Sequence, residues 1–147
     1  MIIVISFILL AQHGDPKGVV ITHNNVINYT YAFQKEFKLT AEKDVVLQQF
    51  TPSFDAFVEE FYPALLNGIK ILSVSKQTIF NSRKLEELIN ENKVTLISCS
   101  PLLLNELNKI DKFKTVKNYI SGGDVLKKDY YNKLIENANV YNTYRAN

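Results

Sequence analysis

Residues 93–107, KVTLISCSPLLLNEL, join a short β-branched run directly to a helical pattern. The run at residues 94–98 predicts a buried strand. Pro101 then occupies a position typical of a first helical turn, and Leu103, Leu107 and Ile110 recur at helical spacing, so we expect a helix over residues 101–109. A strand that leads at once into a helix is the repeating unit of a parallel sheet.

Strand and helix patterns alternate in the same way on both sides of this stretch. Further strands are predicted at residues 45–49, 69–74, 116–120 and 139–142, and further helices at residues 24–37, 55–67, 83–92 and 126–137. Gly68 stands where one of these helices should stop. The alternation predicts an α/β fold in which helices flank a mainly parallel sheet.

The same topology predicts where a ligand would bind. Ligands of open parallel sheets bind beyond the carboxyl ends of the strands. The candidate site is therefore formed by the loops after Ser98, Ile120 and Asn142, together with the loop before Asp55.

The composition indicates one globular unit without a strong charge bias. The chain has 147 residues, of which 46% are hydrophobic, and 17 Lys and Arg against 15 Asp and Glu leave a formal charge of +2. This balance argues against a nucleic acid or an anionic membrane surface as a partner. The single cysteine, Cys99, excludes an internal disulfide and fits a cytoplasmic protein, and two scattered histidines do not make a zinc site.

The first eleven residues, MIIVISFILLA, form an apolar run that allows three interpretations. A signal peptide is the least favoured, because no basic segment precedes the run and no small-residue cleavage site follows it. The run is also too short to span a bilayer. The other two interpretations are a buried strand and a stretch translated out of frame.

The segment GDPKG, residues 14–18, places glycines on either side of a lysine. Gly14 and Gly18 would let the backbone approach a phosphate closely, while Lys17 would supply a point charge. The segment does not match the P-loop pattern, in which Ser or Thr follows Gly-Lys. Local turn chemistry alone favours an ordinary surface turn.

In FTPSFDAFVEE, residues 50–60, Asp55 stands where a loop passes into a helix. Its simplest role is to cap that helix. Glu59 follows four residues later on the same helical face, so the two carboxylates could attract a ligand that carries separated positive charges. A solvated acidic helix face is the simpler local alternative.

Two further strand ends carry small residues. ISGGD, residues 120–124, closes one predicted strand with a glycine pair, and NTY, residues 142–144, closes another. A glycine pair permits either a tight turn or the close approach of a ligand, and the pair itself does not decide between them.

In order and spacing, these segments resemble the adenylate-forming superfamily, most closely the adenylation domains of nonribosomal peptide synthetases. PKGVVITHNNVIN resembles the end of the family's phosphate loop and the helix after it, and FTPSFDAFVEEFYPALLNG resembles its substrate-binding motif. KVTLISCSPLLLNEL, YISGGDVL and VYNTY resemble its next three landmarks. The resemblance extends from Gly14 to Tyr144 and implies a fragment of the large N-terminal subdomain of such an enzyme.

Both ends depart from the family's pattern. The family has a Thr-Ser-Gly-Thr-Thr-Gly-like loop where residues 7–13 are FILLAQH, and Gly-Pro-Thr-Glu where Arg145-Ala146-Asn147 follow Tyr144. Codons can be chosen for residues 7–13 that spell Tyr-Thr-Ser-Gly-Thr-Thr in a shifted frame, and one base inserted after the Tyr144 codon turns Gly-Pro-Thr-Glu into Arg-Ala-Asn-stop. We therefore predict a degenerate, frame-shifted N-terminus (1–13), a partial adenylation domain (14–144) and an aberrant tail (145–147).

The resemblance also implies roles for single residues. Gly14, Lys17 and Gly18 would be the remnant of a loop that holds ATP phosphates, ATP and Mg²⁺ being needed by the parent enzyme. With both nucleotide motifs altered, neither is expected to bind tightly here, and no catalytic residue is assigned. Asp55 would pair with the α-ammonium of an amino acid. The side-chain pocket would be lined by Ala56, Glu59, Ser98, Ile120, Gly122 and Thr143.

This pocket resembles those for a basic, lysine-like amino acid. Small Ala56 and Gly122 leave depth, and the Glu59 carboxylate stands where a lysine side chain would end, with ornithine as the close competitor. A carrier-protein domain would be the partner of the parent synthetase. His23 is expected only to cap or fix the helix at residues 24–37. Two alternatives stay open: a non-catalytic small-molecule-binding module of the same fold, and a small secreted protein.

Overall fold

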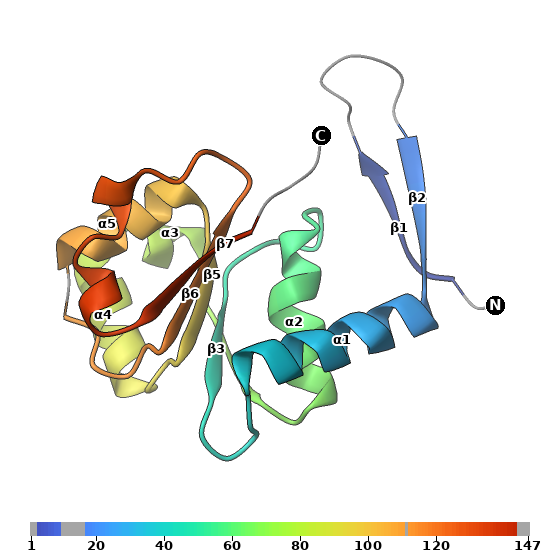
Figure 1. The fold of residues 1–147 in the computed structure, drawn as a ribbon, viewed down its shortest axis with the longest axis horizontal. Coiled ribbons are helices and arrows are strands. Elements are labelled where there is room, and N and C mark those ends of the chain that lie inside the picture. Colours follow the sequence, from blue (N-terminus) through green and yellow to red (C-terminus); the bar gives the residue numbers. More distant parts are fainter. Residues whose placement is uncertain (1–2, 10–16, 111, 144–147) are drawn as a thin grey trace.

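The computed structural model describes residues 3–9, 17–110 and 112–143, with side chains from residue 18 onward. Its main sheet has five parallel strands in the order β4-β3-β5-β6-β7. The bounds are Val45–Gln48 (β3), Lys70–Ser73 (β4), Leu96–Cys99 (β5), Asn118–Gly122 (β6) and Asn139–Thr143 (β7). Helices flank this sheet, which confirms the predicted α/β fold (Figure 1).

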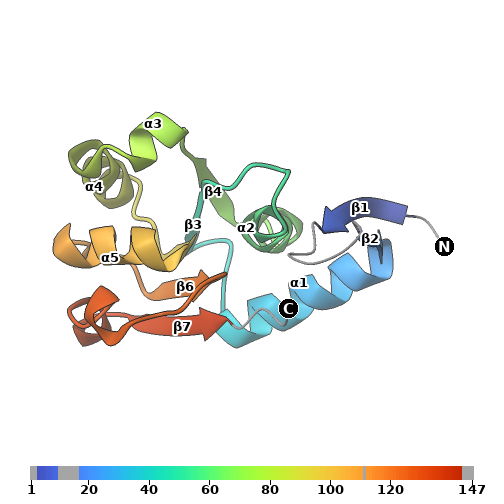
Figure 2. The same cartoon turned by 90° about the horizontal axis from the view of Figure 1, so that it is seen from above.

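The helices form two layers, one on each face of the sheet (Figure 2). One layer contains α1 (His23–Phe37) and α2 (Ala56–Leu66). The other contains α3 (Lys76–Ile79), α4 (Ser82–Glu91) and α5 (Pro101–Ile110), with two 3-10 turns, η1 (Lys128–Tyr130) and η2 (Leu134–Glu136). Among the described residues, no helix is both long and apolar enough to cross a membrane.

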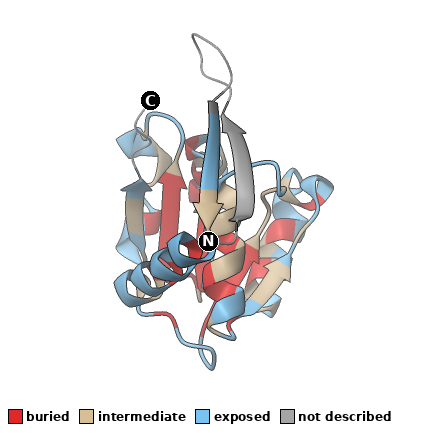
Figure 3. Ribbon diagram, turned by 90° about the vertical axis from the view of Figure 1, so that its right-hand side faces the viewer, coloured by how far each residue is buried: buried red, intermediate tan, exposed pale blue. Residues whose placement is uncertain are grey.

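The central strands β3 and β5 are almost wholly buried, because helices cover both faces of the sheet (Figure 3). In β3, Val45 and Leu47 join the core cluster under α4 and α5, whereas Val46 joins the cluster under α1 and α2. In β5, Ile97 likewise joins the cluster under α4 and α5, and Leu96 joins the cluster under α1 and α2. This alternation follows from the two-residue period of a strand.

An antiparallel hairpin, β1 (Ile3–Leu9) with β2 (Lys17–Thr22), precedes α1 and projects away from the main sheet (Figure 1). The backbone at residues 3–9 thus adopts the strand that was one of three interpretations of the apolar run, and the side chains of this strand lie outside the described part. Thr22 caps α1: its Oγ1 accepts a hydrogen bond from Asn25 N, and Asn25 Oδ1 accepts one from Thr22 N at 2.9 Å.

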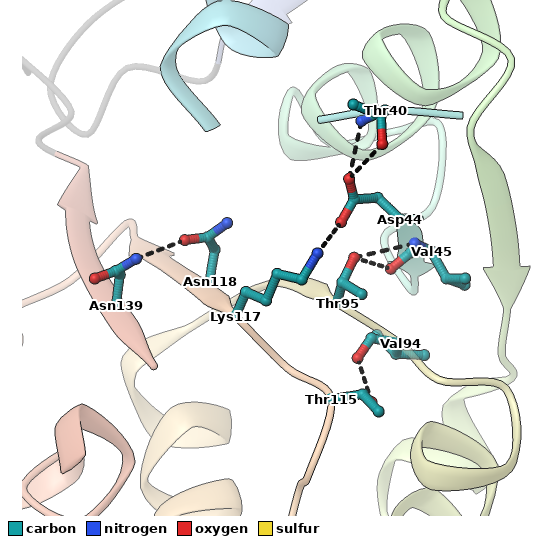
Figure 4. Close-up of polar contacts among 9 residues, drawn as sticks. All are labelled: Thr40, Asp44, Val45, Val94, Thr95, Thr115, Lys117, Asn118 and Asn139. Atoms are coloured by element: carbon teal, nitrogen blue, oxygen red, sulfur yellow. Dashed lines mark hydrogen bonds and ion pairs between the residues drawn. The ribbon is translucent and has the colours of Figure 1, made fainter. Parts of the chain in front are cut away.

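A polar network ties the strands together at the amino end of the sheet (Figure 4). The buried Asp44 carboxylate, just before β3, accepts hydrogen bonds from Thr40 N at 2.9 Å and from Lys117 Nζ at 3.0 Å. Thr95 Oγ1 pairs with the backbone of Val45. Burial would raise the pKa of Asp44, but these hydrogen bonds and the Lys117 charge outweigh it and lower the pKa. The network fixes this end of the sheet, away from the candidate site.

The structure corrects the prediction at residues 126–137. One amphipathic helix was expected there, but the segment forms the turns η1 and η2. The buried Asn108 side chain explains the difference, because its Oδ1 accepts from the backbone N–H groups of Lys133 and Leu134 and its Nδ2 donates to Asp129 O. Those backbone groups therefore form hydrogen bonds with a side chain of α5 and not the hydrogen bonds of a regular helix. The short α3 and the strand β2 were not predicted, and the ends of the predicted strands of the main sheet and of the other predicted helices lie within two residues of their expected positions.

Replacing Asn108 with alanine should lower the free energy of unfolding by about 2–3 kcal/mol, since buried backbone N–H groups lose their acceptor. The measurement is urea unfolding followed by circular dichroism. Asn105→Ala, on the same helix, is the matched control and should change stability by less than about 0.5 kcal/mol. Equal effects of the two substitutions would contradict the role assigned to Asn108.

Candidate functional site

A cavity of about 720 Å³ lies beyond the carboxyl ends of β3, β5, β6 and β7, where parallel sheets bind ligands. Its walls come from α1, from the loop between β3 and α2, and from the first turn of α2. Val19 and Ile21 of β2 complete it on the hairpin side. Most of the lining is apolar, so the few polar groups decide which ligand would fit.

Most of the predicted pocket residues meet at this cavity. Those that line it are Asp55, Ala56, Glu59, Ser98, Gly122 and Thr143. Ile120 does not line it. The Ile120 side chain is 1% exposed and packs with Phe33 and Leu96 in the core cluster under α1 and α2. Strand alternation turns Ile120 to that face of β6.

Asp55 stands at the mouth of the cavity as the N-cap of α2. Its Oδ1 accepts a hydrogen bond from Ala56 N at 2.9 Å, so the simplest predicted role, capping, is confirmed. Asp55 also lines the cavity, together with Glu59 one helical turn further on. The alternative of a wholly solvated acidic helix face is wrong for Glu59, which is partly buried.

The Glu59 carboxylate accepts one hydrogen bond at each oxygen. Ser98 Oγ, at the end of β5, donates to Oε1 at 2.5 Å, and the Tyr29 hydroxyl of α1 donates to Oε2 at 3.3 Å. Burial raises the pKa of Glu59, while the two hydrogen bonds act in the opposite direction. Burial and the nearby Glu59 charge also raise the pKa of the Tyr29 hydroxyl, which therefore stays a proton donor.

Glu60, the next residue of α2, points away from the cavity and holds the loop above it. Its side chain is fully buried, and Oε2 accepts hydrogen bonds from Gln49 N and Phe50 N, both at 3.0 Å. Oε1 has no hydrogen-bond partner among the described residues. Burial is the largest influence and raises the pKa of Glu60 to about 8.

Gly122 ends β6 and is paired with Thr143 of β7. A Cβ atom at this position would collide with the side chain and backbone of Thr143, whose Oγ1 donates to Ser121 O at 3.2 Å. Gly123 follows with φ +88°, in the left-handed region that favours glycine. The glycine pair therefore serves a turn and a close approach between strands, and both residues line the cavity.

The predicted nucleotide-binding residues lie at the hairpin. Gly14 is outside the described residues, and Lys17 begins β2 with its side chain outside them. Gly18 lies within β2 opposite Ile8, so it belongs to a strand and not to a surface turn. Asp55 and Gly122 share the cavity. The cap of α1 is formed by Thr22 with Asn25, so the capping expected of His23 is wrong, while its other expected role, fixing this helix, stays a prediction.

The sequence did not predict roles for Tyr29, which lines the cavity, or for Glu60, which holds the loop beside it. Tyr29 follows the apolar pattern of α1, and its contact with Glu59 spans 30 residues of sequence. Glu60 had a visible signal, since it is an ionisable residue on the face of α2 that also presents Ala64 to the core. The described residues contain no group of three or more His, Cys, Asp or Glu placed to hold a metal ion, so no residue is assigned to Mg²⁺.

The model of the family described as AMP-binding enzyme matches residues 13–144. The chain belongs to this family. It is 47% identical over 133 residues to bacitracin synthase 2 of Bacillus licheniformis and 30% identical over 131 residues to gramicidin S synthase 1 of Brevibacillus brevis. Each match includes 89% of this chain but only 5% and 12% of the respective synthetase, so the chain spans a small part of these relatives.

Solved structures of adenylation enzymes have the same fold. An adenylation domain of Vibrio cholerae, AlmE, in complex with glycyl-adenosine-5'-phosphate, matches 96% of this chain and 27% of its own with a TM-score of 0.79 at 19% identity. The nonribosomal peptide synthetase FmoA3 with AMPPNP bound matches 96% of this chain and 16% of its own with a TM-score of 0.81 at 21% identity. The chain is thus an adenylation-domain fragment of the nonribosomal peptide synthetase type, as the sequence motifs predicted.

Replacing Glu60 with glutamine should change how stability depends on pH. A carboxyl group whose pKa rises to about 8 on folding stabilises the fold fully below its unfolded pKa, and this contribution is lost as pH rises toward 8. Wild type should therefore lose free energy of unfolding, on the order of a few kcal/mol, between pH 5 and pH 8.5, whereas Glu60→Gln should lose much less.

Urea unfolding at several pH values measures this effect. Glu91→Gln, at the exposed end of α4, controls for the loss of one carboxyl group and should keep the wild-type pH dependence. If Glu60→Gln and wild type lose stability in parallel as pH rises, the buried neutral state of Glu60 is wrong.

Proposed function

We propose that this segment forms the amino-acid pocket of an adenylation domain that converts lysine or ornithine and ATP into an aminoacyl-adenylate, which is then passed to a carrier-protein domain. The observation that carries the proposal is the shared cavity of Asp55, Ala56, Glu59, Ser98, Gly122 and Thr143. Asp55 would pair with the α-ammonium of the amino acid at the mouth. Glu59 would then face the end of its side chain.

The charges of this pocket support a basic side chain. Asp55, the N-cap of α2, and Glu59 one turn later both line a largely apolar cavity, and no Lys or Arg side chain from the described residues lines it. A carboxylate removed from water is stabilised by a cation, whereas a neutral or acidic side chain would leave the negative charge uncompensated. Ala56 and Gly122 line the cavity with a small side chain or none, which leaves room for a long side chain.

We further propose that the 147-residue chain does not catalyse adenylation alone and binds neither ATP nor Mg²⁺ tightly. Residues 7–13, FILLAQH, replace the hydroxyl- and glycine-rich loop that the family places before Pro-Lys-Gly. A lysine without such a nest of backbone donors is a lone charge that does not preorganise a phosphate site. Adenylate formation depends on positioning the ATP phosphates and on stabilising their charge. Losing this loop should therefore severely reduce the adenylation activity.

Amino-acid-dependent pyrophosphate exchange by an intact adenylation domain that carries this segment, with both interrupted motifs restored, tests the substrate. We expect lysine or ornithine to be preferred, and Glu59→Gln to lower kcat/KM for the preferred amino acid roughly a hundredfold, because an ion pair in the pocket is lost. Glu42→Gln, at an exposed position, should have no effect. Pyrophosphate exchange that neither lysine nor ornithine stimulates would refute the proposed substrate.

The isolated chain gives a second measurement. Calorimetry with ATP and with lysine should show no tight binding of the nucleotide. The same pyrophosphate-exchange assay should show no exchange by the isolated chain. Tight binding of ATP without exchange would favour a non-catalytic binding module of the same fold. Exchange by the isolated chain would overturn the proposed inactivity.

The interruptions at residues 1–13 and 145–147 are proposed to be frame shifts. Sequencing of the encoding DNA and its flanks should find codons for Thr-Ser-Gly-Thr-Thr in a shifted frame before the Gly14 codon, and codons for Gly-Pro-Thr-Glu in a shifted frame after the Tyr144 codon. In-frame DNA without these codons would remove the explanation.

A further inference from the structure

The polar end of the cavity is made by side chains from three distant parts of the chain. Glu59 belongs to α2, Ser98 to β5 and Tyr29 to α1. Ser98 and Tyr29 each donate to a different oxygen of the Glu59 carboxylate. Since a carboxylate can accept about four hydrogen bonds, both oxygens keep capacity for a donor from a ligand in the cavity.

Tyr29 is held in this position by a row of aromatic rings. Along one face of α1, its ring lies 5.8 Å from that of Phe33, and the Phe33 ring lies 4.6 Å from that of Phe37. Phe37 meets Tyr141 of β7 edge-on at 4.9 Å. These contacts attach α1 to the sheet and fix the Tyr29 ring, so that its hydroxyl is presented to Glu59 with little loss of side-chain entropy.

We propose that Tyr29 is a specificity-determining positioning residue, which holds the Glu59 carboxylate so that the cavity prefers an amino acid with a cationic side chain over a neutral one of equal length. This inference rests on the proposed function, because it assumes an amino acid in the cavity. Tyr29 acts through Glu59 and does not touch the reacting atoms.

The charge state of Glu59 makes the role measurable. Asp55 lies one turn before it on α2, Glu60 follows it, and the buried Cys99 of β5 lines the same cavity. Burial and the Asp55 charge favour a neutral Glu59, while the two hydroxyl donors favour the carboxylate. Removing the Tyr29 hydroxyl should therefore move the pKa of Glu59 further upward, and the preference for a cation should appear only at higher pH.

The test compares Tyr29→Phe with wild type in the 147-residue chain. Phenylalanine keeps the ring contact with Phe33 and removes only the donor. The matched control is Tyr31→Phe, since Tyr31 lies on the same helix and is 67% exposed. Carbon-13 NMR of the Glu59 carboxyl follows its titration, and titration with L-lysine and L-norleucine compares side chains of similar length with and without the ammonium group.

We expect Tyr29→Phe to raise the pKa of Glu59 and to reduce the lysine-to-norleucine affinity ratio at pH 7 by roughly tenfold, as for the loss of a hydrogen bond to a charged group. Tyr31→Phe should change neither. An unchanged Glu59 titration in Tyr29→Phe overturns the positioning role, and a shifted titration with an unchanged affinity ratio overturns the specificity role.

Two further outcomes are decisive. If the wild-type chain does not prefer lysine, the proposed substrate and the specificity role both fail, while the titration still decides whether Tyr29 positions Glu59. If Tyr29→Phe does not fold, 3-fluorotyrosine at position 29 replaces it as the variant. Its more acidic hydroxyl is a stronger donor and should lower the pKa of Glu59, and an unchanged titration would overturn the proposal.

Discussion

The cavity depends on one buried contact, in which the Glu60 carboxyl group accepts hydrogen bonds from the backbone N–H groups of Gln49 and Phe50. These residues begin the irregular loop that connects β3 to α2, and Asp55 ends it by capping the helix that carries Glu60. The loop is thus fastened at both ends to the same helix. Without the contact, two buried backbone donors would lose their acceptor, and the mouth of the cavity would have no fixed position.

Glu59 and Glu60 are adjacent but have different surroundings, which explains how two neighbouring carboxyl groups can both be removed from bulk water. Glu60 points into the protein, where a pKa of about 8 keeps it largely neutral at pH 7. A neutral Glu60 does not repel a negative charge on Glu59, which faces the cavity and has a hydroxyl donor at each oxygen. Different environments can assign different protonation states to two neighbouring carboxyl groups, and here only one of the two is turned toward a ligand.

The fold was predictable because it follows from local periodicity, whereas parts of the site were not. The alternation of strands and helices, with a site beyond the strand ends, brought Asp55, Ser98, Gly122 and Thr143 into one cavity as expected. Residues 126–137 have a helical pattern, yet the Asn108 amide takes the backbone donors of that segment. The sequence pattern of one segment does not predict hydrogen bonds from a distant segment. The role of Tyr29 was missed for the same reason, because its partner Glu59 lies 30 residues away.

The layer formed by α1 and α2 therefore does more than cover one face of the sheet. Phe33 and Ala64 bury the core on that side, while Tyr29 and Glu59 of the same two helices form the polar end of the cavity. Since helices move as rigid units in a close-packed interior, a change of packing between α1 and the sheet would displace the Tyr29 hydroxyl relative to Glu59. The selectivity of the cavity should thus depend on core residues such as Phe37 that never contact a ligand.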